Sequence, residues 1–379
     1  MDKELYLKNL NDYLHLIALY FNKKEAPDFK IDENNINFFF NLSKKHSLTA
    51  LFYKAVKDTK VDIKEEYLRK LEEYYYANVR KHVLFDKERE ELFKYFYLNQ
   101  IIYLPLKGIV LKDYYFDPYT REFADNDIYF QGDDKLVRKF FLDREYKVES
   151  FRKSNHDVYM KKPCLNFEMH RALFGESVEK KFVDYFDKPK IKGLITNEVC
   201  GGYLDVNDFY IYFTAHSFKH FSHSGCGLRT LLDYYIYLKR NADNSSLDFK
   251  YINKELKKLG LLDFSNSISS LAIKVFDEQE LNEEEKETLL FLASSGTYGT
   301  LEQSVSKGIK KKGKFRYFMS RIFPPYSFYK TYYPWAYYSF ILIPVAWLVR
   351  FFRILFKNPK RATKELKLIS KSKEEKSEN

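Results

Sequence analysis

Two carboxylates one residue apart, Asp125 and Asp127, are the side chains in this 379-residue chain whose type and spacing best suit chemistry. Residues 126–130 have the pattern of a short strand, and side chains two apart on a strand share a face. Mg²⁺ binds one or two carboxylates together with phosphate oxygens and water, and paired metal ions can hold both the attacking and the leaving oxygen. The pair therefore suits a site that holds a nucleoside triphosphate through magnesium.

A third carboxylate strengthens this hypothesis. The acidic pair alone is weak evidence, because 53 acidic residues in 379 produce several such pairs by chance, and a solvated strand end is the plainer interpretation. Residues 164–170 alternate, however, with apolar side chains on one face and Asn166, Glu168 and His170 on the other. Glu168 could join the two aspartates from a neighbouring strand of the same sheet. The alternative is an edge strand that shows ordinary polar residues to water.

A Lys-Gly turn stands before the aspartates, and a lone arginine stands between the turn and the pair. The apolar run 101–106 predicts a short buried strand that enters a turn at Gly108. Lys107 and Arg121 would neutralise phosphate oxygens, and Gly108 would let the backbone approach them. The alternative is surface charge on a loop.

Together these features resemble the polymerase-beta-like nucleotidyltransferase superfamily and, more narrowly, the bacterial family labelled uncharacterised nucleotidyltransferase. The resemblance is clearest over residues 100–240, and the matching positions are Leu106, Lys107, Gly108, Tyr115, Asp117, Pro118, Arg121, Asp125, Asp127, Ile128, Glu168, His170, His216, Lys219, His220, Leu228, Arg229 and Asp233. It implies an α+β fold with a polymerase-beta-like core, a small mixed sheet with helices, flanked by N-terminal and C-terminal helical regions. The chain departs from the usual pattern at Lys107, Asn126 and Glu145.

The resemblance also implies an activity. A nucleoside monophosphate would pass from an NTP, such as ATP, to an unidentified acceptor, and pyrophosphate would leave. Asp125, Asp127 and Glu168 would be the catalytic residues and would bind Mg²⁺ in a two-metal site, and Glu168 would help to take the acceptor's proton. The acceptor could be a sugar, another small molecule or a protein.

A run of histidines gives a rival signal. A helix predicted to begin near Asp208, a candidate N-cap, carries His216 and His220 four residues apart and therefore on one face. With His223 and Cys226 these histidines are possible zinc ligands, although no second ligand pair has a familiar spacing. They could instead pack in the core, cap the helix or face a cleft. The possible cleft residues are His170, His216, Lys219, His220 and Arg229.

Four regions follow from the pattern along the chain. Residues 1–98 carry helical signals, including an apolar stripe from Leu5 to Ile17 and a run without Gly or Pro over 63–99. Residues 99–206 carry the short strands of the nucleotidyltransferase core, with a helix near 135–142. Residues 207–300 form a helical subdomain that completes the cleft, and residues 301–379 form basic and aromatic helices with a polar tail.

Composition sets the class of partner. The net charge of +11, from 64 basic and 53 acidic residues, favours anionic partners such as nucleotides, nucleic acid or a phospholipid surface. No specific nucleic acid is expected, because no RNA-binding module is recognisable, so an RNA-directed transferase is a lesser alternative. Three cysteines at irregular spacing and an N-terminus without a signal sequence predict a cytoplasmic protein.

The C-terminal region suggests contact with a membrane. A basic cluster at 307–316 precedes the uncharged, aromatic run 334–349, which is shorter than the about 20 residues of a spanning helix. Residues 315–356 could lie on the inner face of the cell membrane, or 334–356 could be a buried helix. A non-catalytic membrane-associated scaffold for envelope polysaccharide biosynthesis is therefore the alternative function.

Overall fold

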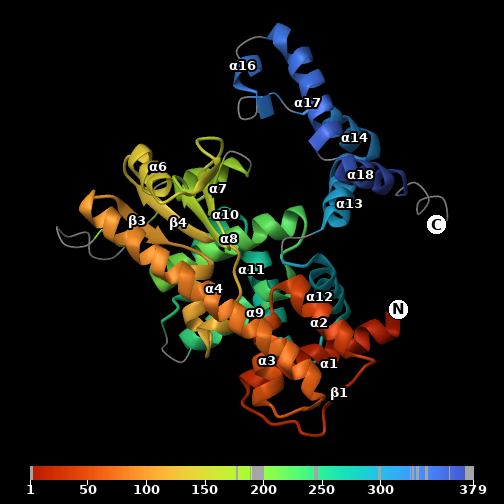
Figure 1. Ribbon diagram of the computed structural model, residues 1–379. Helices are drawn as coiled ribbons and strands as arrows, with labels where there is room; N and C mark the ends of the chain where they lie inside the picture. Colours follow the sequence, from red (N-terminus) through yellow and green to blue (C-terminus); the bar gives the residue numbers. More distant parts are fainter. Residues whose placement is uncertain are drawn as a thin grey trace. The chain divides into compact units, whose positions relative to one another are not determined.

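The chain is α+β and divides into two compact units in the computed structural model (Figure 1). The structure describes residues 3–175, 178–187, 189, 200–242, 246–297, 300–324, 326, 328, 329, 333–337, 340–357 and 359–371. The first unit comprises 1–219 and 226–297, and the second comprises 220–225 and 298–379. The four-part division predicted from the sequence stays a prediction, and the last eight residues of the predicted polar tail lie outside the described residues.

The N-terminal part of the first unit is helical. Its elements are α1 (Lys3–Phe21), β1 (Lys30–Ile31), α2 (Ile36–His46), α3 (Thr49–Asp58), β2 (Asp62–Ile63) and α4 (Glu65–Leu98). The predicted apolar stripe of α1 is buried at Leu10, Leu14 and Ile17, whereas Leu5, near the start of the helix, is 49% exposed. The predicted run without Gly or Pro forms one continuous helix of 34 residues, α4, because nothing in it removes a backbone hydrogen bond.

A five-stranded mixed sheet follows α4. Its strands are β3 (Ile102–Pro105), β4 (Asn126–Gln131), β5 (Lys147–Ser150), β6 (His156–Lys161) and β7 (Leu165–His170), in the order β3-β4-β7-β6-β5. The β4–β7 pair is parallel and the other pairs are antiparallel. The predicted strands within 101–106, 126–130 and 164–170 are therefore confirmed. Short elements connect the strands: α5 (Gly108–Leu111), η1 (Lys112–Tyr114), η2 (Pro118–Thr120), α6 (Asp134–Asp143) and, after β7, α7 (Lys180–Phe186).

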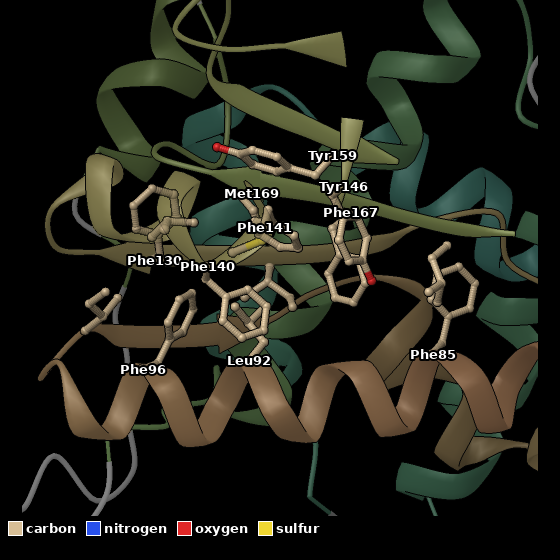
Figure 2. Packing of buried hydrophobic residues seen from close by; sticks show 14 of the residues in the cluster. Phe85, Leu92, Phe96, Phe130, Phe140, Phe141, Tyr146, Tyr159, Phe167 and Met169 are labelled. Atoms are coloured by element: carbon tan, nitrogen blue, oxygen red, sulfur yellow. The ribbon is translucent and has the colours of Figure 1, made fainter. Parts of the chain in front are cut away.

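One face of this sheet carries the hydrophobic core. Figure 2 shows α4 running beneath the strands and contributing Phe85, Leu92 and Phe96 to a buried cluster. The sheet contributes alternate residues, including Phe167 and Met169 of β7, and α6 adds buried side chains beside them. Because successive side chains of a strand point to opposite faces, the residues between these apolar positions lie on the other face. That face carries Asp127 and Glu168.

Helices resume after the sheet. They are α8 (Val206–His223), α9 (Gly227–Ala242), α10 (Phe249–Leu259), α11 (Leu262–Phe276) and α12 (Glu283–Ser295). The N-cap prediction for α8 was wrong by three residues: Asp205, not Asp208, accepts hydrogen bonds from the backbone N–H groups of residues 207 and 208. An N-cap side chain must precede the first helical turn to reach those groups. Asp208 instead accepts a hydrogen bond from the Tyr251 hydroxyl.

The second unit is built from helices. They are α13 (Leu301–Lys312), α14 (Lys314–Ile322), α16 (Pro334–Tyr337), η3 (Phe340–Leu342), α17 (Ile343–Lys357) and α18 (Pro359–Lys371). Two small apolar clusters hold them, one around Tyr329, Tyr333 and Ala346 and one around Val305, Tyr317 and Ile369. None of the described helices is long and apolar enough to cross a membrane.

Candidate active site

The parallel pairing of β4 with β7 places two carboxylates side by side. In this register Asp127 lies opposite Glu168, and Tyr129 lies opposite His170. Both carboxylates occupy the face opposite the hydrophobic core, as the alternation of 164–170 predicted. Asp125 directly precedes the first residue of β4. The sheet thus brings Asp127 and Glu168 together, with Asp125 two residues along the chain.

Asp127 is buried and has two cationic or proton-donating partners. Lys107 Nζ lies 2.6 Å from Asp127 Oδ1, and His170 Nε2 donates to the same oxygen at 2.8 Å. Burial opposes ionisation of Asp127, but the Lys107 ammonium and His170 outweigh it and hold the pKa of this carboxyl below its usual range. Asp127 is therefore an anion at neutral pH. Burial likewise opposes the charge of Lys107, but Asp127, Tyr212, Glu168 and Asp125 together outweigh it and raise the pKa of Lys107.

The pKa values of the other two carboxyls, Asp125 and Glu168, shift upwards. Burial, followed by the charge of Asp127, raises the pKa of Asp125 to about 6. Burial, followed by Asp127 and Asp125, raises the pKa of Glu168 to about 7. When three acidic groups lie close together and partly away from water, ionising all of them costs free energy. A divalent cation would relieve this repulsion, so the donor set fits a metal ion that prefers oxygen ligands, such as Mg²⁺.

His156 is a site residue that was missed from the sequence. It opens β6 directly opposite His170, and its Nε2 lies 3.6 Å from Glu168 Oε2. In the described part of the chain, the cluster of three side chains arranged to hold a metal ion is His156, Glu168 and His170. A hairpin signal was available, because Lys162-Pro163 separates two segments of strand length. Pairing those segments would have placed His156 beside His170.

Lys107 holds an unusual backbone conformation. Its φ of 47° and ψ of −115° lie in a region that favours glycine, although the residue carries a full side chain. Lys107 follows the end of β3 by two residues, and its ammonium contacts Asp127. Such outliers persist only where the surroundings enforce them, and they concentrate at functional sites.

Arg121 has a partner that the sequence did not reveal. Its Nε and Nη2 each donate to Asp233 at 2.8 Å, and both side chains are buried. Tyr115 donates to the same carboxylate. Arg229 and Asp233 are four residues apart in α9, a spacing that permits an intrahelical ion pair, but Arg229 donates to the Glu122 carbonyl oxygen instead. Phosphate binding by Arg121 stays a prediction. The nitrogen that could bind phosphate is Nη1, because it has no acceptor among the described residues.

Gly108 is needed where it stands. A Cβ atom at this position would lie 2.9 Å from Arg121 Nη1 and 3.1 Å from the Cβ of Phe123.

The unusual amide, Asn126, also has an explanation: it lies on the core face of β4, and its Oδ1 accepts a hydrogen bond from Arg89 Nη1 of α4 at 2.7 Å. A polar residue inside the core face is thus matched by a polar residue on the helix beneath it.

The predicted cleft residues of α8 lie in different units. His216 and Lys219 belong to the first unit and His220 to the second. Burial, followed by repulsion from Lys107, lowers the pKa of Lys219, while Glu168 and Asp127 act in the opposite direction. Lys219 is therefore electrostatically coupled to the site. The cleft roles of His216 and His220, and the zinc hypothesis with His223 and Cys226, stay predictions.

Metal affinity should depend on pH in a direction set by Glu168 and Asp125. The pKa of Glu168 is about 7 in the metal-free fold, against about 4.5 in the unfolded chain. The metal-free fold is therefore more stable at low pH, and it loses this stability as the pH rises from about 4.5 through about 7. Mg²⁺ must displace those protons, so its stabilising effect should grow over the same range. We expect the Mg²⁺-induced rise in Tm to be larger at pH 8 than at pH 5.5, and to lose most of this dependence in Glu168→Gln. A rise that is equal at the two pH values would contradict the assignment.

The strain at Lys107 can be measured with two variants. Lys107→Ala and Lys107→Gly both remove the ammonium, but only glycine adopts the native φ and ψ without a steric penalty. We expect Lys107→Gly to be more stable than Lys107→Ala by about 1 kcal/mol, measured by urea unfolding. Equal stability of the two variants would show that the backbone here is not strained.

One protein family has a model that covers the region carrying these residues. The model of the family described as "Uncharacterised nucleotidyltransferase" matches residues 32–277, well over half of the chain. The match includes every site residue described above. No curated protein and no solved structure matches the chain. The chain belongs to the uncharacterised nucleotidyltransferase family.

Proposed function

We propose that this protein transfers a nucleoside monophosphate from an NTP to a hydroxyl or similar acceptor and releases pyrophosphate, with Mg²⁺ as cofactor. The family supports nucleotidyl transfer in general terms. The observation that supports the finer proposal is the arrangement of Asp127, Glu168 and Asp125, in which one carboxyl is ionised and the pKa values of its two neighbours are raised by burial and crowding.

Each residue has a role in this proposal. The acceptor oxygen attacks the α-phosphorus of the NTP, the bond between the α- and β-phosphates breaks, and the acceptor's proton passes to Glu168. Lys107 holds Asp127 in the metal-free protein and can neutralise phosphate oxygens once a cation takes its place.

Magnesium would be held by Asp125, Asp127 and Glu168. When bound, it would stabilise the negative charge on the phosphate oxygens and acidify the acceptor hydroxyl. The chain's own groups supply orientation: the parallel register sets Asp127 against Glu168, and His170 fixes the orientation of the Asp127 carboxylate through its hydrogen bond.

We further propose that the sheet is a polymerase-beta-like nucleotidyltransferase core. The mixed sheet with two acidic residues at the start of one strand and a third on its parallel neighbour supports this assignment. The alternative is a non-catalytic scaffold. A scaffold would have no use for a buried cluster of carboxyls, because burying carboxylates without a ligand costs free energy. Retention of all three carboxyls favours the enzyme.

The proposal is tested by Asp127→Asn. This change removes the one carboxyl that is firmly ionised while keeping its shape, so turnover should fall at least about a hundredfold, as for the loss of a charge-stabilising group. Turnover is measured as pyrophosphate release from NTP and Mg²⁺ with a host-cell extract as the source of acceptor. Asp143→Asn, which removes the same charge from the exposed end of α6, is the matched control and should keep full activity.

A folding defect must be separated from a catalytic one. Far-UV circular dichroism and Tm of the Asp127→Asn protein should resemble those of the wild type, because Lys107 and His170 can still hydrogen-bond the amide oxygen. A folded variant with unchanged turnover would refute the role given to Asp127.

A further inference from the structure

Two imidazoles flank the carboxylate of Glu168. His156 Nε2 lies 3.6 Å and His170 Nε2 lies 3.8 Å from Glu168 Oε2. The ligand atoms of the three side chains all lie within 4.8 Å of one another. A tetrahedral ion with bonds of about 2.1 Å has its ligand atoms roughly 3.4 Å apart, so the side chains would close in around the ion. The three side chains come from two adjacent antiparallel strands, which hold their backbones rigidly.

Imidazole is a common metal ligand, because one ring nitrogen of its neutral form carries a lone pair. His156 has no evident role in the fold: its buried Nδ1 has no hydrogen-bond partner in the described residues, and its distance to Glu168 is too long for a hydrogen bond.

We infer that His156, Glu168 and His170 form a binding site for one Zn²⁺ ion. Two imidazoles and a carboxylate with an open fourth position are a zinc donor set, and nitrogen ligands favour zinc over magnesium. The ion would replace one contact, the hydrogen bond from His170 to Asp127. Because Glu168 is shared with the proposed nucleotide site, bound Zn²⁺ should inhibit Mg²⁺-supported turnover.

Cobalt provides a readout that is independent of activity. The purified full-length protein should bind one Co²⁺ per chain with visible absorption, and excess Zn²⁺ should displace it. His156→Ala should weaken Co²⁺ binding at least about tenfold, since even an indirect partner of a metal ligand is worth that much. Asp125→Asn should keep Co²⁺ binding while losing turnover, which separates this site from the proposed catalytic one. Absence of Co²⁺ absorption in the wild type, or unchanged binding in a folded His156→Ala, would overturn the inference.

The second unit presents an independent feature, helix α17. One side of this helix packs inward: Ala346 is buried in the cluster with Tyr329 and Tyr333. Trp347 Nε1 and Arg350 Nη1 both donate to the Ile322 carbonyl oxygen, at 2.8 and 3.1 Å. These positions recur three and four residues apart and therefore form one face.

The opposite face of α17 is apolar and exposed. Val345, Leu348, Val349, Phe352 and Phe356 follow each other at the same helical spacing, and Ile341 precedes them. Leu348 is 57%, Phe352 53% and Phe356 82% exposed. Water-facing sides of surface helices are normally polar, and contiguous apolar patches mark a contact with another apolar surface. The outward face of α17 therefore lacks its partner among the described residues.

The net charge of residues 301–379 indicates which kind of surface the outward face of α17 contacts. Residues 301–379 contain 18 Lys and Arg against 5 Asp and Glu, a net charge of +13. The whole chain has 64 against 53, so residues 1–300 have 46 against 48, a net charge of −2. All of the chain's positive excess thus belongs to the region that exposes the apolar face. Joining two copies of this region would bring two large positive charges together, which opposes a dimer through α17.

We also propose that the outward face of α17 inserts into the surface of an anionic phospholipid bilayer. The helix has 15 residues and spans about 22 Å at 1.5 Å per residue, less than the about 30 Å of a hydrocarbon core. It would therefore lie along the interface, with its apolar side chains in the acyl boundary and the basic residues near lipid headgroups. This proposal does not depend on nucleotide turnover.

Vesicle sedimentation tests the lipid surface directly. Full-length protein should sediment with vesicles of phosphatidylglycerol and phosphatidylcholine, bind pure phosphatidylcholine more weakly, and lose affinity as salt is raised. The double variant Leu348→Glu/Phe352→Glu should bind about tenfold or more weakly, because two apolar side chains no longer leave water. Val83→Glu, on the exposed side of α4, makes the same kind of change in the first unit and should bind normally.

Three results would overturn the lipid assignment. The first is absence of the wild type from the anionic vesicle pellet, and the second is a folded double variant that binds as the wild type does. Alternatively, light scattering could find a wild-type dimer that the double variant converts to a monomer, and the occupant of the face would then be a second copy of the chain.

Discussion

The parallel register between β4 and β7 is the constraint on which the site depends. It places Asp127 against Glu168 and Tyr129 against His170, so like charges meet where water is scarce. The fold offsets that repulsion with Lys107 and His170, which keep Asp127 ionised, while the pKa values of Glu168 and Asp125 are raised. A site in this state is poised to exchange protons for a divalent cation. Shifting β4 by one residue would turn Asp127 towards the core and separate it from Glu168.

The opposite face of the sheet makes this arrangement rigid. Helix α4 and helix α6 cover the alternate, apolar residues of the strands. Arg89 of α4 reaches through this layer to Asn126, the residue between the two aspartates. The hydrogen bond links the long helix to the acidic strand at the point where the carboxylates begin. On the far side of the turn, the buried Arg121–Asp233 pair ties the segment before β4 to α9.

Local patterns predicted the elements, and long-range contacts explain what they missed. Alternation over 164–170 identified β7 and its polar face, because side-chain period in a strand is a local property. The pairing of Arg121 with Asp233 was not predictable, since 112 residues separate them and a closer arginine, Arg229, offered a simpler helical pair. His156 was missed because its relevance comes only from the β6–β7 register. The strained backbone of Lys107 is likewise enforced by tertiary contacts rather than by its own preference.

The two units differ in the partners that their chemistry suits. The first is close to neutral and holds the acidic cluster, whereas the second carries the positive charge and the exposed apolar helix face. Together they would suit an enzyme that acts on nucleotides while resting on an anionic surface. The residues proposed for catalysis and those proposed for attachment differ, so the two functions would be separable.

The most direct test of nucleotidyl transfer follows the two ends of the triphosphate separately. Purified protein is incubated with Mg²⁺, a host-cell extract and NTP labelled at either the α- or the γ-phosphate, and the products are separated. The account predicts that α-label enters an acceptor while γ-label leaves as pyrophosphate, and that both signals disappear together without Mg²⁺. Transfer of the γ-label to an acceptor would contradict it, because the reaction would then be phosphoryl transfer and the roles given to Asp125, Asp127 and Glu168 would have to be reassigned.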